Sequence, residues 1–242
     1  MKDIAELSVT QSRLYSADSF PFAHICFQVN AQVIRDAFKF EQAQFDGTTL
    51  TFQSGTVEHQ GRSVLISSLT IEERKLQIKI LGRSAAADAV YAALVPVLQS
   101  LDTGGITTNY NPILKTEETT CVATLDIDFD SLVSPGISRF IRTKAMDALH
   151  TDFATPTSIG LRRLSFEVRY ELADPHLRDH SITVANKVFR IEPRIGTPWQ
   201  ERRFFTLSPT DSETHFALLK TLEKELSKNQ KRKQHRKKSR IA

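Results

Sequence analysis

The sequence predicts an α+β fold made of two similar units, each with the element order β-α-β-β-β-α and an antiparallel sheet covered by helices. Segments in which every second residue is apolar alternate with segments whose apolar residues recur at helical spacing. The strand-like segments come in closely spaced groups, which is typical of antiparallel hairpins. The predicted boundaries are 1–105 for the first unit, 106–119 for a connector, 120–227 for the second unit and 228–242 for a disordered basic tail.

The first unit is predicted to begin with a strand at 22–29, where apolar residues alternate. A short helix is expected after Asn30, because the apolar residues that follow are spaced for one helical face. Three strands are then expected at 49–59, 62–71 and 74–81, since short turn-like breaks separate these runs.

The last helix of the first unit is expected to begin at Ser84, a residue suited to cap a helix. Pro96 is expected to end or kink this helix, because proline cannot donate a backbone hydrogen bond. The following stretch, 102–119, is rich in Gly, Thr and Asn and is interpreted as a connector.

The second unit repeats this order of elements without detectable identity of residues. A strand is expected at 120–129, and then a helix with Ser134 as its cap and Pro135 as its first residue. The predicted strands that follow are 159–172, 181–192 and 200–207. The final helix begins with the capping-box pattern Thr210-Asp211-Ser212-Glu213.

Composition favours a cytoplasmic protein that does not enter a membrane. The chain has 242 residues, of which 40% are hydrophobic and 25% are charged. It has no signal-like apolar segment near the N-terminus and no apolar run near the ~20 residues that cross a bilayer. Cys26 and Cys121 are too few for a disulfide framework, so both are expected to be reduced thiols.

Charge is strongly segregated along the chain. Residues 228–242 hold eight cations and no acid, which leaves 24 cations against 28 acids in the body. A flexible segment of this kind attracts the phosphate backbone of nucleic acid, and eight phosphate contacts on duplex DNA would give a log–log salt slope of about −7. The predicted contact residues in the tail are Lys231, Arg232, Lys233, Arg236, Lys237, Lys238 and Arg240. A solubilising end is the alternative interpretation.

Two arginine pairs in the body are candidates to extend this surface. They are Arg162 with Arg163 and Arg202 with Arg203, and Phe204 and Phe205 follow the second pair. Basic residues interleaved with aromatic ones bind single strands by charge and stacking. Pairing of these arginines with acids on neighbouring strands is the alternative.

Acidic residues offer weaker candidates for a metal site. Asp126, Asp128 and Asp130 are spaced to share one face of a strand, and with Glu167 they could hold Mg²⁺ for phosphodiester cleavage. A predicted loop gathers further ligand types in His176, Asp179 and His180, but their spacing matches no metal signature. Solvent-facing acids and a polar turn account for both groups, so no metal and no cofactor is predicted.

The sequence therefore favours a non-enzymatic binding protein that its basic tail tethers to DNA or RNA. One alternative is a metal-dependent nuclease that uses the acidic strand residues. The other is a protein-interaction subunit of a larger assembly, with a protein partner or a second copy of the chain as its target.

Overall fold

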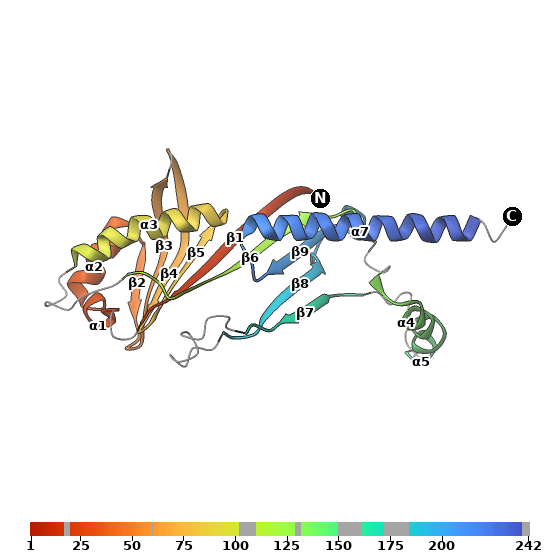
Figure 1. Cartoon of the computed structure of the whole chain (residues 1–242), viewed down its shortest axis with the longest axis horizontal. Coiled ribbons are helices and arrows are strands. Elements are labelled where there is room, and N and C mark those ends of the chain that lie inside the picture. The colour runs from red at the N-terminus through yellow and green to blue at the C-terminus, as the bar shows by residue number, and fades with distance from the viewer. Residues whose placement is uncertain are drawn as a thin grey trace.

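Nine antiparallel strands form one continuous sheet in the computed structural model of the chain, which describes residues 1–16, 20–59, 61–101, 110–128, 132–149, 161–171 and 184–238. The order across the sheet is β2-β3-β4-β5-β1-β6-β9-β8-β7, so β1 (Lys2–Leu14) and β6 (Leu114–Thr124) lie side by side at its centre (Figure 1). The predicted α+β class is confirmed. The strands of the two predicted units belong to one shared sheet, however, because β1 pairs with both β5 and β6.

The first half follows the predicted hairpins closely. Its elements are α1 (Phe22–Ile25), α2 (Gln28–Ala37), β2 (Gln42–Phe45), β3 (Thr49–His59), β4 (Arg62–Glu72), β5 (Lys75–Leu81) and α3 (Ser84–Ser100). The strands predicted at 49–59, 62–71 and 74–81 are confirmed to within one residue at each end. Pro96 lies inside α3 and does not end it, since the helix continues to Ser100.

The predicted first strand, 22–29, is wrong. This segment forms α1 and the start of α2, and the apolar side chains of Phe27 and Val29 are 58% and 76% exposed. The true first strand is β1, which the hydrophobic pattern conceals because Gln11 and Arg13 occupy two of its inward positions, at 0% and 3% exposure. A strand is recognised by apolar residues at every second position, and the residues at these two inward positions are polar.

The second half has shorter strands than the sequence predicts. Its elements are α4 (Pro135–Phe140), the π-helical turn η2 (Ile141–Ala145), α5 (Met146–Ala148), β7 (Leu164–Val168), β8 (Lys187–Pro193), the 3₁₀ turn η3 (Trp199–Glu201), β9 (Arg203–Ser208) and α7 (Ser212–Lys238). The predicted cap of α4 is confirmed, since Ser134 Oγ accepts a hydrogen bond from the Ile137 amide. The strand predicted at 120–129 is β6, which starts inside the predicted connector at Leu114 and ends at Thr124.

Helix α7 differs from its prediction at both ends. Its cap is Asp211 instead of Thr210, because Asp211 Oδ1 accepts the Thr214 amide at 2.8 Å. At the other end the helix continues to Lys238, so the prediction that disorder begins at 228 is not confirmed. Lys, Arg and Gln have good helix propensity, and an existing helix can extend through them without a new nucleation step. None of the described helices is long and apolar enough to cross a membrane.

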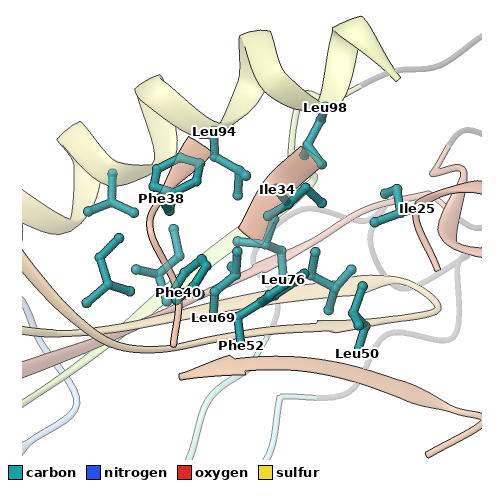
Figure 2. Packing of buried hydrophobic residues seen from close by; sticks show 14 of the residues in the cluster. Ile25, Ile34, Phe38, Phe40, Leu50, Phe52, Leu69, Leu76, Leu94 and Leu98 are labelled. Atoms are coloured by element: carbon teal, nitrogen blue, oxygen red, sulfur yellow. The ribbon is translucent and has the colours of Figure 1, made fainter. Parts of the chain in front are cut away.

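Two apolar clusters lie between the sheet and the helices. The first, shown in Figure 2, joins β3, β4 and β5 to α2 and α3 through residues such as Ile34, Phe52 and Leu94. The second joins β6, β8 and β9 to α7 and includes Ile191 and Phe204. Helices α2, α3 and α7 all lie on the same side of the sheet (Figure 1). We call this the helix side, and the opposite surface of the sheet the open face.

The N-termini of α3 and α7 cap each other. The Ser84 amide donates to Ser212 Oγ at 3.1 Å, and the Ser212 amide donates to Ser84 Oγ at 2.9 Å. Both serines are buried, so each side chain satisfies a backbone donor that would otherwise lack a partner. This reciprocal contact fixes the two helices relative to each other over the centre of the sheet.

Candidate nucleic-acid interface

The open face is rich in hydroxyl and amide side chains. On every central strand the residues that alternate with the buried core positions remain accessible to solvent on this face. The cross-strand pairs assign these residues to it: Thr49, Thr51, Gln53, Ser68, Thr70, Gln77, Lys79, Ser8, Thr10, Ser12, Thr116, Glu118 and Thr120. The hydroxyl and amide groups among them both donate and accept hydrogen bonds, and side chains of this kind contact phosphate and sugar oxygens in nucleic-acid complexes.

A row of paired residues crosses both halves of the open face. Leu65 pairs with Leu81, Leu81 with Ser8, Ser8 with Thr120, and Thr120 with Leu207. Leu65 and Leu81 are 53% and 55% exposed, so they form an apolar patch among the polar residues. Strands lie about 4.8 Å apart, and this row therefore spans roughly 20 Å.

Arg190 extends the row by one more strand, to β8. Arg190 pairs with Leu207, and its guanidinium lies 5.1 Å from the ring centroid of Phe205 on the same face. The buried Arg190 Nε has no hydrogen-bond partner among the described residues. A cation held on an aromatic ring can contact a phosphate or stack on a base.

The predicted arginine pairs lie at the beginnings of two different strands. Arg162 and Arg163 precede β7, whereas Arg202 and Arg203 lie at the start of β9, with β8 between them. Arg163 Nε contacts Glu192 Oε2 at 2.7 Å, and Arg202 forms an ion pair with Asp126. The alternative interpretation of pairing with acids therefore holds for these two. Arg162 is exposed and Arg203 is half-buried at the edge of the open face.

The predicted tail residues belong largely to α7. Lys231, Arg232, Lys233, Arg236, Lys237 and Lys238 fall within the helical backbone of α7, and Arg240 lies outside the described residues. In Figure 1 the end of α7 continues past the sheet. The cations of this segment are therefore carried on a helix that leaves the acidic body.

The acidic residues proposed for a metal site are not brought together. Asp126 and Asp128 follow the end of β6 and are not part of a strand, and Asp130 lies outside the described residues. Glu167 lies on β7, three strand spacings or about 14 Å across the sheet, whereas Mg²⁺ ligands lie about 2.1 Å from their ion. Glu167 instead contacts Arg169 and Asn186. Among the described residues no group of three or more His, Cys, Asp or Glu side chains could hold a metal ion.

The predicted loop cluster of His176, Asp179 and His180 lies outside the described residues.

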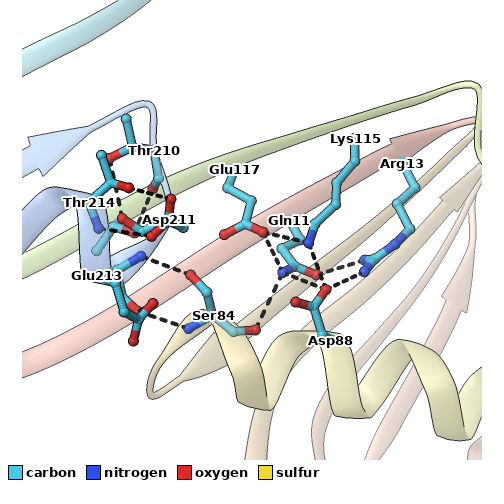
Figure 3. A network of polar contacts seen from close by, with 12 residues as sticks. Gln11, Arg13, Ser84, Asp88, Lys115, Glu117, Thr210, Asp211, Glu213 and Thr214 are labelled. Carbon is cyan, nitrogen blue, oxygen red and sulfur yellow. Dashed lines mark hydrogen bonds and ion pairs between the residues drawn. The ribbon is translucent and has the colours of Figure 1, made fainter.

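A polar network that the sequence did not predict lies on the helix side between β1, β6 and α3 (Figure 3). Asp88 Oδ1 accepts hydrogen bonds from Arg13 Nη2 at 2.8 Å and from Lys115 Nζ at 2.7 Å. Gln11 Nε2 donates to Glu117 Oε1 at 2.8 Å, and Lys115 Nζ contacts the same oxygen at 2.7 Å. The sequence does contain a signal for this network. Gln11 and Arg13, and likewise Lys115 and Glu117, are two residues apart, so the polar residues of each pair share one face of a strand.

This network has two cations and two carboxylates, so its charges balance. Burial acts to raise the pKa of Asp88, but hydrogen bonds from Lys115 and Gln11 outweigh it and hold that pKa below its ordinary value. Burial acts to lower the pKa of Lys115, and its bonds to Asp88 and Glu117 raise it instead. Arg13 also stacks 3.8 Å from the Tyr91 ring centroid. With the Lys115 ammonium and the Asp88 carboxylate held in their charged forms, the network joins elements and is not poised for proton transfer.

A second buried polar group surrounds His215 on the helix side. His215 Nε2 lies 2.8 Å from Thr206 Oγ1 and 3.6 Å from Cys121 Sγ, while Nδ1 lies 2.6 Å from Ser208 Oγ. Burial lowers the pKa of His215 to about 4 and raises that of the Cys121 thiol. Both side chains are fully buried. A neutral imidazole and an un-ionised thiol without access to substrate form a structural hydrogen-bonded cluster.

No protein-family model matches this chain, and no match is found among curated proteins.

Proposed function

We propose that this chain is a non-enzymatic nucleic-acid-binding protein. The observation that carries this proposal is the segregation of charge, with eight cations and no acid in residues 228–242 and an excess of acids in the rest of the chain. In this proposal the cationic end of α7 holds the protein on the phosphate backbone of DNA or RNA by releasing counterions. Such contacts give affinity without reading sequence.

The open face is proposed as the surface through which the body contacts the same nucleic acid. Its hydroxyl and amide groups, the exposed pair Leu65 and Leu81, and the cations Lys79 and Arg190 support this assignment. Sheet faces that bind duplexes combine polar side chains, which contact base edges and sugars, with apolar ones, which press on the groove. Helices α2, α3 and α7 cover much of the helix side (Figure 1), which leaves the open face as the broader accessible surface of the described sheet.

The two halves are further proposed to derive from an internal duplication. Each half contributes a central strand, a helical segment, three consecutive antiparallel strands and a long helix, with β2 as an addition in the first half. The reciprocal contact between Ser84 and Ser212 supports this proposal, because a two-fold relation places the same residue of each unit against its counterpart. The row of paired residues across the open face also supports a two-fold relation. The pair Leu81 and Ser8 of the first half lies next to the pair Thr120 and Leu207 of the second half, with Ser8 and Thr120 paired at the centre.

The cationic end is tested by fluorescence anisotropy with the full-length protein and a variant that ends at residue 227. Both are titrated with single-stranded and double-stranded DNA and RNA over a series of salt concentrations. We expect the log–log salt slope on duplex DNA to approach about −7 for the full chain and to lose most of that value in the truncated one, which keeps only the contacts of the open face. Equal binding by the two proteins at every salt concentration contradicts the proposal, and absence of binding at low salt favours a protein-interaction subunit instead.

The open face is tested separately with two charge reversals. Lys79→Glu changes a cation on the open face, and Lys220→Glu makes the same change at an exposed position of α7. We expect Lys79→Glu to weaken duplex binding roughly tenfold at low salt, equivalent to about 1.4 kcal/mol, and Lys220→Glu to have a much smaller effect. An equal effect of both variants shows that only overall charge matters and removes the open face from the proposal.

A further inference from the structure

The second half contains a helical segment with an uncovered apolar surface. We call residues 135–148, which comprise α4, η2 and α5, the arm. The side chains of Ile137 and Phe140 are 55% and 60% exposed, and Leu149 at its end is 58% exposed. Figure 1 shows the arm standing away from the sheet and from α7. Ile137 and Phe140 are three residues apart on one face of α4, and these two side chains and Leu149 are left in water.

A matching apolar surface is uncovered on the same half. Phe166 of β7 is 52% exposed, and its ring centroid lies 6.2 Å from that of Phe189 on β8. Leu164 pairs with Ile191, which is buried in the second core under α7. Since directly paired residues share a face, Leu164 and Phe166 point to the helix side. The helix side of β7 and β8 therefore has apolar residues that α7 does not cover.

The first half shows which element covers such a surface. There α2 lies over the sheet, with Ile34 fully buried, and the chain after α2 places the Phe40 ring 5.1 Å from Phe52 of β3 in a stacked arrangement (Figure 2). In chain order the arm stands where α2 stands, between the central strand and the outer strands of its half. This comparison rests on the proposed duplication.

We propose that the arm docks on the helix side of β7 and β8 of its own chain and buries Phe140 against Phe166. Leu132 and Leu161, on either side of the arm, both pack against the second core. Anchoring both ends close to the uncovered surface gives an effective concentration in the millimolar range. That concentration favours the chain's own arm over the arm of a second copy. The chain then has a closed form, in addition to the extended form of Figure 1, and the closed form hides the apolar surface from other partners.

A double-mutant cycle tests this docking without any nucleic acid present, so its result is independent of the proposed binding function. The variants are Phe140→Ser, Phe166→Ser and the double substitution, and thermal unfolding is recorded for each. We expect each single change to lower the Tm by about 2–4 °C, and the double change to lower it no further than one single change, because both remove the same contact. Leu65→Ser, at a position equally exposed but on the open face, is the matched control and should add fully to Phe140→Ser.

Two outcomes overturn the proposal. Full additivity of Phe140→Ser and Phe166→Ser shows that the two side chains do not meet. A coupling that appears only at high protein concentration shows that the arm of a second copy occupies the surface. A coupling that is the same at low and high concentration supports docking within one chain.

Discussion

His215 shows how burial sets the chemistry of a single residue in this protein. The imidazole is fully buried, and the groups that face it are the hydroxyls of Thr206 and Ser208 and the thiol of Cys121. None of these three carries a charge that could offset a protonated ring. Burial therefore lowers the pKa of His215 to about 4.

The pH dependence of stability follows from this shift. The unfolded chain takes up a proton near pH 6.5 and the folded chain only near pH 4, so stability is complete above pH 6.5 and falls as the pH drops toward 4. The loss from this group amounts to about 3 kcal/mol, at about 1.4 kcal/mol per pKa unit. Urea unfolding of the wild type and of His215→Gln across this pH range measures the loss of stability. We expect the variant to be less stable at neutral pH but to have a flatter profile, and a profile as steep as that of the wild type would contradict this role of His215.

Gly55 shows the effect of close packing at one position. A Cβ atom at Gly55 would lie 2.4 Å from Cδ1 and Cε1 of the Phe40 ring, which is itself buried in the first core. Neither the ring nor the strand can shift freely there. The strand can pass so close to the Phe40 ring because residue 55 has no side chain.

We expect Gly55→Ala to lower the free energy of unfolding by about 1–3 kcal/mol through overpacking. Gly136→Ala is the matched control, because a Cβ there would meet no atom within 4 Å and position 136 is helical. That control should be neutral or slightly stabilising. The midpoints of urea denaturation compare the two, and an unchanged midpoint for Gly55→Ala would show that Phe40 can move aside.

At the scale of elements, the reciprocal capping of α3 and α7 joins the two halves. The first backbone amide of each helix donates to the serine hydroxyl of the other helix, through Ser84 and Ser212, and in α7 this contact adds to the cap that Asp211 supplies. The stability of the two helix N-termini is therefore shared. A cap within one helix, such as Ser134 on α4, has no such partner.

Substitution of either serine by alanine should lower the free energy of unfolding by about 1 kcal/mol, as for an ordinary cap. The double variant Ser84→Ala/Ser212→Ala should lose a different amount from the sum of the single variants, because the two side chains belong to one contact. Ser134→Ala combined with Ser84→Ala should be additive. Equilibrium denaturation of the five variants measures this, and strict additivity for both pairs would contradict a shared cap.

At the scale of the whole molecule, β1 belongs to both cores. Val9 of β1 and Tyr15, which directly follows the strand, are buried in the first cluster, whereas Leu7 of β1 and Met1, which directly precedes it, pack against the second. The Met1 amino group also forms an ion pair with Glu223 on α7. Loss of either core therefore removes support from the strand on which the other depends.

We expect the chain to unfold in one cooperative transition. The only tryptophan of the chain, Trp199, lies in the second half, so its fluorescence reports on that half, while far-ultraviolet circular dichroism reports on both. Leu69→Ala in the first core should shift both transitions equally, by about 2–5 kcal/mol of unfolding free energy. Two separated transitions would instead show that the predicted units 1–105 and 120–227 fold independently.

The sequence alone determined the elements whose causes are local. The three strands from Thr49 to Leu81 were predicted almost to the residue, because apolar alternation and tight turns act between near neighbours in the chain. The cap of α4 at Ser134 and the segregation of charge at the C-terminal end are of the same kind.

Tertiary structure decided what depends on residues far apart in the chain. Gln11 and Arg13 can point inward on β1 because Gln11 donates to Asp88 and Glu117 and Arg13 forms an ion pair with Asp88. No local sequence pattern predicts these partners, which are distant in the chain. Phe27 and Val29 contribute to an apolar alternation that predicts a strand in a helical segment, although both side chains are exposed. Alternation alone does not show whether a face packs against another element. The union of both halves in one sheet likewise depends on the pairing of β1 with β6, which lie about 110 residues apart.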